Sequence, residues 1–351
     1  MKMSQFKIAT LMLVLSPCIV FGQVTKSKEI KKHYNVSGDG NLTIGSKYGD
    51  VHVETWDKNE VDIDITIEMT KRSEAKALQY LDKIEIVIDD ASVDDLSFTT
   101  TINGSLDNSR NDRMKIVYQV KVPVSLNMNL ANKYGNLYLA DSRGKMTINV
   151  AYGNIKIGEL DGSIDLKLSY GNGEVDRVND GEVVARYSNL EIDDTGNLEV
   201  SNSYSNLDFG KSEEVDLINK YGNLTWEGLN NLKGTSKYGS VKIEKLYKSL
   251  VLETRYGSGV KVNWISRDFS YIDIESSYAT VTLKFQPGMA ASLDAELKYG
   301  DLKNYDIEFD HSYIDESGSM TTYKGKLGKG PSSGKIKISS AYGNVKMSYA
   351  K

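Results

Sequence analysis

A tyrosine, usually followed by glycine, recurs along this chain at a nearly constant spacing, and this repeat constrains the fold more than any other feature. From Tyr134 to Tyr256 successive repeat tyrosines lie 18, 18, 17, 17, 17, 17 and 18 residues apart, and the next two spacings are 22 and 21. A unit of this length cannot bury an apolar face of its own, whereas stacked copies can. The repeat tyrosines are Tyr48, Tyr134, Tyr152, Tyr170, Tyr187, Tyr204, Tyr221, Tyr238, Tyr256, Tyr278, Tyr299 and Tyr342.

Apolar residues alternate on both sides of each repeat tyrosine. Ile148 and Val150 alternate before Tyr152, and Ile155 and Ile157 resume the alternation after it in the opposite phase. Period two indicates β-strands with one buried face, and the change of phase indicates a bend, for which glycine can adopt positive φ. Each repeat is thus predicted to be strand, turn, strand and bend. Stacked at about 4.8 Å, such units form an all-β fold, a parallel β-solenoid with rungs of 17–22 residues. Crossovers between parallel strands favour right-handed winding.

Two positions of the repeat are predicted to form ladders along the stack. The tyrosine shares the phase of the apolar residues before it, so we expect it in the core, with its hydroxyl reaching a turn. The alternative is an exposed ladder that stacks on sugar rings. The position two residues before the tyrosine is Ser, Asn or Thr in eight rungs, and we expect it to bind backbone groups that the bend leaves unpaired. These residues are Ser46, Asn132, Asn202, Asn219, Ser236, Thr254, Ser276 and Ser340.

Residues 1–22 have the composition of a secretory signal peptide. Lys2 and Lys7 precede an apolar run, and cleavage is expected after Gly22. The sole cysteine, Cys18, lies in this segment, so the mature chain would contain no disulfide. No later segment contains an apolar run long enough to span a membrane. We therefore predict an exported protein, periplasmic or at the cell surface, that is not an integral membrane protein after signal cleavage.

The remaining chain is predicted to have two parts. Residues 23–125 break the repeat and read as the first rung or rungs with an N-terminal cap, which contains a helix at about residues 73–83. Leu78 and Leu81 would give this helix its apolar stripe. A cap would cover a strand edge that otherwise invites aggregation. Residues 126–351 hold the solenoid repeats, with a glycine-containing loop insertion at about residues 306–334.

The repeat and the segment before it resemble a known family. The residues that carry the likeness are the run from Tyr48 to Asp57, the alternation from Val61 to Ile67, the strand from Ile116 to Pro123 and the Tyr-Gly-Asn rungs. Together they resemble the bacterial adhesin family of exported β-solenoid proteins, a domain of unknown function. The resemblance covers about residues 30 to 350 and implies no catalytic residue, because the family has none that are agreed.

The chain shows little sign of catalytic chemistry. His33, His52 and His311 have neither metal-ligand nor catalytic-triad spacing. Neighbouring carboxylates such as Asp193 and Asp194 would point to opposite sides of a strand. We therefore predict no catalytic residue, no metal ligand and no cofactor. With 43 basic and 48 acidic residues the formal net charge is −5, which argues against a nucleic-acid partner.

A row of cations is the most suggestive surface feature. The residue just before the repeat tyrosine is Lys or Arg in seven of twelve rungs, and the alternation points it outward. In an acidic protein such a row could bind an anionic glycan, a cell-envelope component or a protein. The alternative is that these side chains merely keep strands soluble. The candidate ligand-facing residues are Lys133, Arg186, Lys220, Lys237, Arg255 and Lys298, and Lys47 shares their position.

These observations predict a non-enzymatic exported protein, adhesin-like or acting as an envelope binding or scaffold protein, that presents a repetitive surface. Two alternatives stay open. One is a β-helix carbohydrate-active enzyme, either a polysaccharide lyase or a glycosidase, and the other is a periplasmic regulatory binding protein.

Overall fold

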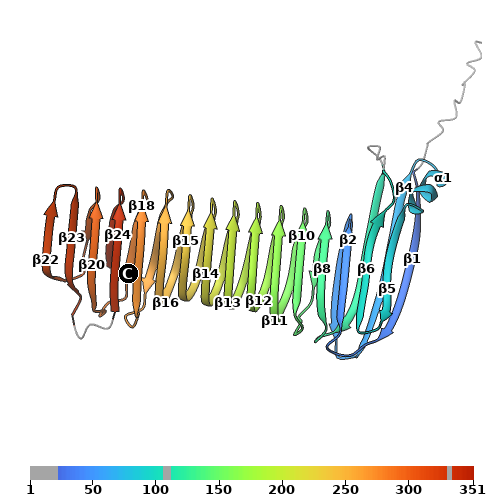
Figure 1. The fold of residues 1–351 in the computed structure, drawn as a ribbon, viewed down its shortest axis with the longest axis horizontal. Helices are drawn as coiled ribbons and strands as arrows, with labels where there is room; N and C mark the ends of the chain where they lie inside the picture. The colour runs from blue at the N-terminus through green and yellow to red at the C-terminus, as the bar shows by residue number, and fades with distance from the viewer. Residues whose placement is uncertain (1–22, 106–111, 330–333) are drawn as a thin grey trace, which may run out of the picture.

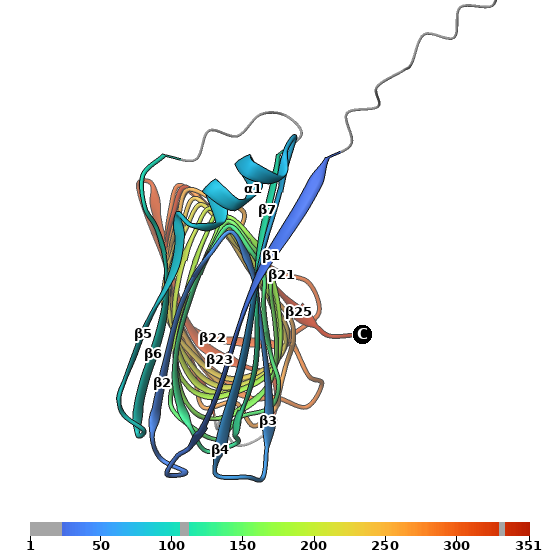
Figure 2. The ribbon, with the colours of Figure 1, turned by 90° about the vertical axis from the view of Figure 1, so that its right-hand side faces the viewer.

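The computed structural model describes residues 23–105, 112–329 and 334–351. The predicted signal peptide, residues 1–22 with Cys18, lies outside these ranges. The described chain is almost entirely β-strand, with a single α-helix. In Figure 1 successive strands lie side by side along one long axis, and Figure 2 looks along this stack. The all-β, solenoid-like architecture of consecutive parallel strands is confirmed.

Each rung contributes to two faces of the stack, which meet at a corner formed by the repeat tyrosine. We call the strands that lead into the tyrosine the entry face and those that leave it the exit face. Each rung also bends a second time, midway between two tyrosines. From β11 to β16 the strands stay paired with their neighbours through this second bend, where the sequence predicted a turn between separate strands. The strands of the regular stack are β2 (Asn41–Lys47), β3 (Gly49–Trp56), β8 (Asn127–Lys133), β9 (Leu137–Leu139), β10 (Met146–Ala151), β11 (Ile155–Ser169), β12 (Asn172–Arg186), β13 (Asn189–Ser203), β14 (Asn206–Lys220), β15 (Asn223–Lys237), β16 (Ser240–Arg255), β17 (Gly259–Ile265), β18 (Tyr271–Ser277) and β19 (Val281–Phe285).

The register places like residues over one another. Leu190 pairs with Leu207, which in turn pairs with Leu224, and Phe209 pairs with Trp226. These side chains are all buried, and the Phe209 and Trp226 rings stack with centroids 4.9 Å apart. One apolar core therefore runs through the stack, because a parallel in-register pairing turns each inward position into a continuous ladder.

The N-terminal end departs from the regular stack. On the exit face β1 and β7 both pair antiparallel with β4, and β7 runs parallel to β3. On the entry face β5 pairs antiparallel with β6, which runs parallel to β2. The helix α1 contacts β1 and β4, as Figure 2 shows. The bounds are β1 (Val24–Asn35), β4 (Glu60–Lys71), α1 (Glu74–Leu81), β5 (Ile84–Ser92), β6 (Asp95–Ile102) and β7 (Arg113–Pro123).

The buried face of α1 differs from the predicted stripe. Ser73 accepts a hydrogen bond from the Lys76 amide as N-cap, and the helix then buries Ala77 and Leu81. Leu78 is 46% exposed, so its predicted place in the apolar stripe is wrong. Residues 77 and 81 are four apart and lie on one helix face, whereas residue 78 lies 100° away from 77.

At the C-terminal end the rungs do not follow the order of the chain. The last rung, β24 and β25, lies between the rung of β18 and β19 and the rung of β20 and β21. Within the predicted loop at 306–334 the structure has the antiparallel strands β22 and β23, and β23 pairs with β20 (Figure 1). The bounds are β20 (Ala291–Lys298), β21 (Leu302–Asn304), β22 (Phe309–Ser317), β23 (Met320–Leu327), β24 (Gly334–Ala341) and β25 (Val345–Tyr349).

Candidate functional site

The twelve repeat tyrosines form one exposed ladder along the corner between the two faces. Their exposed fractions lie between 41% and 56%, and successive rings stack with centroids 4.6–5.3 Å apart. The prediction of a core position is therefore wrong. All twelve adopt positive φ, between 51° and 64°, and this left-handed conformation reverses the phase of the strand and points the ring outward.

The glycine after the tyrosine serves close packing and not the bend that was expected of it. A Cβ at Gly135 would lie 1.7 Å from the Gly49 carbonyl oxygen, and one at Gly153 would lie 1.9 Å from that of Gly135. The φ of these glycines is not in the positive region, which the tyrosine before them occupies instead. The Tyr-Gly pair thus divides two tasks: tyrosine makes the bend, and glycine lets adjacent rungs approach.

A buried polar ladder stabilises the bend from inside. Asn219 Nδ2 donates to the Gly222 carbonyl oxygen and to Ser236 Oγ, both at 2.9 Å. Asn132 Nδ2 donates to the carbonyl oxygens of Gly49 and Asn136, also at 2.9 Å. The prediction that this position pairs backbone groups of the bend is confirmed for the three asparagines and for Ser276 and Ser340. Such bonds matter because an unpaired buried carbonyl costs free energy comparable to a lost hydrogen bond. Ser46 Oγ and Thr254 Oγ1 have no hydrogen-bond partner among the described residues.

A second polar ladder runs outside the corner, on the exit side of the tyrosines. It consists of the second residue after each tyrosine, and side-chain hydrogen bonds of 2.7–3.2 Å link neighbouring rungs. The exposed corner therefore presents a row of phenols beside a row of amides, both at the spacing of the rungs. This polar row contains Asp50, Asn136, Asn154, Asn172, Asn189, Asn206, Asn223 and Ser240.

The basic row lies on the entry side of the tyrosines, but the structure divides it. Lys220, Lys237 and Arg255 occupy adjacent rungs. Glu253 contacts two of these three, at 3.9 Å from Lys237 Nζ and 2.8 Å from Arg255 Nε. The three therefore form the longest cationic segment of the row, partly offset by one carboxylate.

The other members of the row stand apart from this segment. Lys133 pairs with Lys47 on the neighbouring rung, and its ammonium lies 5.0 Å from the Tyr134 ring centroid. Arg186 lies between Ser169 and Ser203, and Lys298 lies beyond Ala341 at the C-terminal end. Whether the row faces a ligand stays a prediction. The functional candidates that the sequence pattern misplaced are the repeat tyrosines, which it assigned to the core. Their regular recurrence was the signal that marked the position.

The histidines and carboxylates do not converge on a centre. His33 Nδ1 lies 2.6 Å from Asp62 Oδ1, His52 stacks on Tyr138 with centroids 4.6 Å apart, and His311 lies near Phe309. Within residues 23–105, 112–329 and 334–351, no group of three or more His, Cys, Asp or Glu side chains could hold a metal ion. Over the same ranges no helix is both long and apolar enough to cross a membrane.

The structure raises the pKa of five tyrosines, and Tyr118 and Tyr204 illustrate the causes. Burial raises the pKa of Tyr118 in β7 to about 12, against the opposing effect of its hydrogen bond with Thr100. In the ladder, desolvation raises the pKa of Tyr204, and the neighbouring phenols of Tyr221 and Tyr187 add to this. Both groups therefore favour the neutral phenol.

No family model matches the chain, and no curated protein matches it. Among solved structures it is similar to a provisionally named cell adhesion protein from Clostridium sporogenes, with 12% identity over 92% of this chain and 100% of that chain and a TM-score of 0.21. A provisionally named adhesin from Parabacteroides distasonis has 12% identity over 91% and 97%, with a TM-score of 0.31. A provisionally named lipid-binding protein from the same organism has 12% identity over 92% and 96%, with a TM-score of 0.24.

The adhesin names agree with the family resemblance drawn from the sequence, and these neighbours are named as adhesins and not as enzymes. At these identities and TM-scores the likeness carries no argument about the function or the site of this chain. The ladders described above therefore have to support the functional conclusion by themselves.

Proposed function

We propose that this protein is an exported, non-enzymatic binding protein of the cell envelope, adhesin-like, that binds an extended anionic polymer along the tyrosine corner. In this proposal the chain winds as a right-handed solenoid with rungs of 17–22 residues. The observation that carries the proposal is the unbroken exposed ladder of twelve tyrosines, flanked by polar and cationic residues. A surface that repeats at each rung matches a ligand that is itself long and repetitive.

The stacking decides how such a ligand could be held. Inside the ladder both faces of each ring are covered by neighbouring rings at 4.6–5.3 Å, so a sugar ring has no face on which to stack. What remains exposed are ring edges and hydroxyl groups, which form hydrogen bonds. The polymer would therefore lie along the phenols and accept their hydrogen bonds, while Lys220, Lys237 and Arg255 attract its charges.

The test compares two triple variants in binding to polygalacturonate and to its carboxyl-reduced, neutral counterpart. One variant, K220Q/K237Q/R255Q, removes the cationic segment of the corner. Its control, K156Q/K242Q/K261Q, removes the same charge from outward positions of the exit face. Because exposed ion pairs each contribute about 0.2–1 kcal/mol, we expect roughly tenfold weaker binding for the first variant and little change for the control.

Equal losses in the two variants, or equal binding of the neutral polymer, would contradict this proposal. The export proposal has its own measurement. Protease added to intact cells should digest the protein if it lies on the surface, and it should spare the protein until lysis if it lies in the periplasm. Protection would rule out an adhesin acting at the cell surface and would favour a periplasmic partner.

A further inference from the structure

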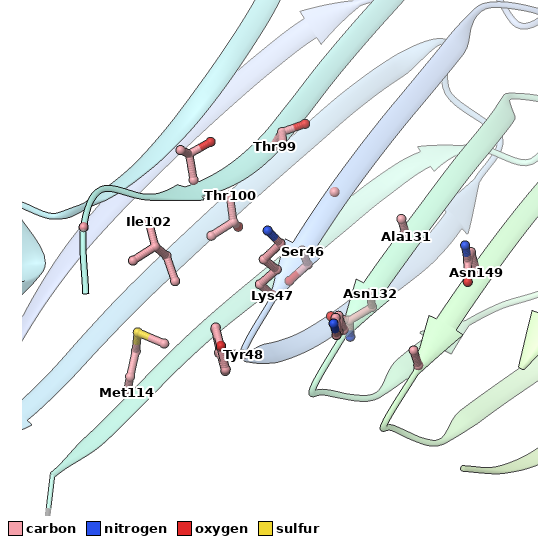
Figure 3. A pocket seen from close by; sticks show the side chains of 15 residues that line it. Ser46, Lys47, Tyr48, Thr99, Thr100, Ile102, Met114, Ala131, Asn132 and Asn149 are labelled. Atoms are coloured by element: carbon pink, nitrogen blue, oxygen red, sulfur yellow. The ribbon is translucent and has the colours of Figure 1, made fainter. Parts of the chain in front are cut away.

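A hollow of about 690 Å³ opens at the N-terminal end of the tyrosine ladder, over the outward side of β6, β2, β8 and β10 (Figure 3). Its floor is low because small residues, Gly45, Ala131 and Ala151, occupy outward positions of three neighbouring rungs. Thr99 of β6 pairs with Gly45 and bounds the hollow on one side, and Asn149 lies on the other. The volume falls within the roughly 300–1,000 Å³ typical of small-molecule sites.

The hollow is cationic, although the chain as a whole is acidic. Lys47 and Lys133 line it, and no Asp or Glu is found among its described lining residues. The Lys133 ammonium also lies 5.0 and 5.8 Å from the ring centroids of Tyr134 and Tyr152. In the described part of the chain neither lysine forms an ion pair with a carboxylate. A hollow of about 440 Å³ further along the entry face has the opposite character, since five Asp and Glu residues line it and no cation does. The two unneutralised charges select for an anionic ligand.

Tyr48 ends the ladder and is stacked on one side only, as Tyr299 is at the other end. Tyr134 covers one face of its ring at a centroid distance of 5.1 Å, and no second ring among the described residues stacks on the other face. In Figure 3 Tyr48 lies between Asn132 and Met114 of β7, and all three residues line the hollow. A phenol ring beside cations and hydroxyl groups is a combination that recognises a charged sugar, because the C–H groups of a pyranose pack on an aromatic ring.

We propose that this hollow binds a single sugar unit that carries a carboxylate or a sulfate group. The sugar packs against the Tyr48 ring, its anionic group lies between Lys47 and Lys133, and its hydroxyls bond to Thr99, Thr101 and Asn149. The proposal rests on the anionic ligand class of the proposed function and assigns to that ligand a separate end-binding site. Binding to the hollow requires one acidic unit, whereas binding along the corner requires many.

The exit face provides a matched control, because Lys242 and Lys261 pair across neighbouring rungs as Lys47 and Lys133 do, and both are exposed. The experiment measures binding of trigalacturonic acid by calorimetry to protein purified after export of the full chain. We expect K47Q/K133Q to weaken binding at least tenfold and K242Q/K261Q to change it less than twofold. The methyl ester of the trisaccharide should bind at least tenfold more weakly to the unmodified protein.

A second pair of variants tests the ring face. Y48N removes it and keeps a residue that tolerates positive φ, and Y299N does the same at the other end of the ladder. We expect only Y48N to weaken trisaccharide binding. Equal losses in the two lysine pairs would overturn the hollow as the site, as would equal binding of the ester or displacement of the trisaccharide by equimolar inorganic sulfate.

The two proposals fail separately. Loss of trisaccharide binding in K47Q/K133Q, with polymer binding unaffected by K220Q/K237Q/R255Q, would support the hollow and contradict the corner. The reverse pattern would support the corner and contradict the hollow. Thermal unfolding of each variant checks that the fold is retained, and if Y48N does not fold, the lysine pairs decide the question alone.

Discussion

The middle of the tyrosine ladder and its N-terminal end use the same residues for different purposes. In the middle, each ring lies between two rings, and glycines such as Gly171 and Gly239 pack on the glycine of the neighbouring rung. At Tyr48 the stack of rings stops, because the next strands, β6 and β7, belong to the N-terminal part and bring no repeat tyrosine. Repetition thus makes structure in the middle and leaves, at the end, a ring with one ring neighbour beside Lys47 and Lys133.

Breaking the close approach of rungs in the middle should have the largest effect. In Gly153→Ala the new Cβ would lie 1.9 Å from the Gly135 carbonyl oxygen, and both atoms belong to the backbone, so neither can move aside cheaply. We expect a loss of about 3 kcal/mol in the free energy of unfolding, at the upper end of overpacking. Urea unfolding measures it.

The control for that substitution is Gly228→Ala, where the nearest atom to a new Cβ is a Tyr247 side-chain carbon at 3.5 Å. This variant should unfold within about 0.5 kcal/mol of the unmodified protein. If both variants were equally stable, the argument that glycine is required for rung packing would fail.

Removing single rings should sharpen the difference between middle and end. Tyr221 has ring partners on both sides, at 4.6 and 4.8 Å, and Tyr48 has one. Since an aromatic pair contributes about 0.5–1.5 kcal/mol, Tyr221→Asn should cost about twice as much stability as Tyr48→Asn. Asparagine is used in both because it tolerates the positive φ of the tyrosine. Equal costs in thermal unfolding would mean that ring stacking contributes little.

The smallest effect concerns alkaline pH. The folded protein raises the pKa of Tyr118 from 10.0 to about 12, so between these values the unfolded chain ionises while the folded one stays neutral. The contribution of Tyr118 to the free energy of unfolding should therefore be fully present below pH 10 and decrease as the pH rises toward 12. Tyr118→Phe should flatten this fall, measured by urea unfolding across the pH range. An unchanged slope would show that another group controls the alkaline loss.

The sequence alone predicted the main architecture. The spacing of the tyrosines and the alternation on both sides of them were enough for an all-β stack of parallel rungs. The same patterns predicted the inward polar ladder of Asn132 and Asn219, because both follow from the period of the strand. A repeat carries its own register, so the contacts between neighbouring rungs are already implied by the spacing.

What the sequence did not show depends on single backbone conformations and on pairings between distant segments. The left-handed conformation of the tyrosines turns the rings from the core to the surface, and it occurs also where Ser188, Ser205 or Ala279 replaces the glycine. The insertion of β24 between β18 and β20 depends on strand pairing across many residues. The hollow beside Tyr48 arises where β6 and β7 meet the first rungs. Local periodicity is encoded along the chain, whereas the exposed ladder and its free end exist only once distant segments lie side by side.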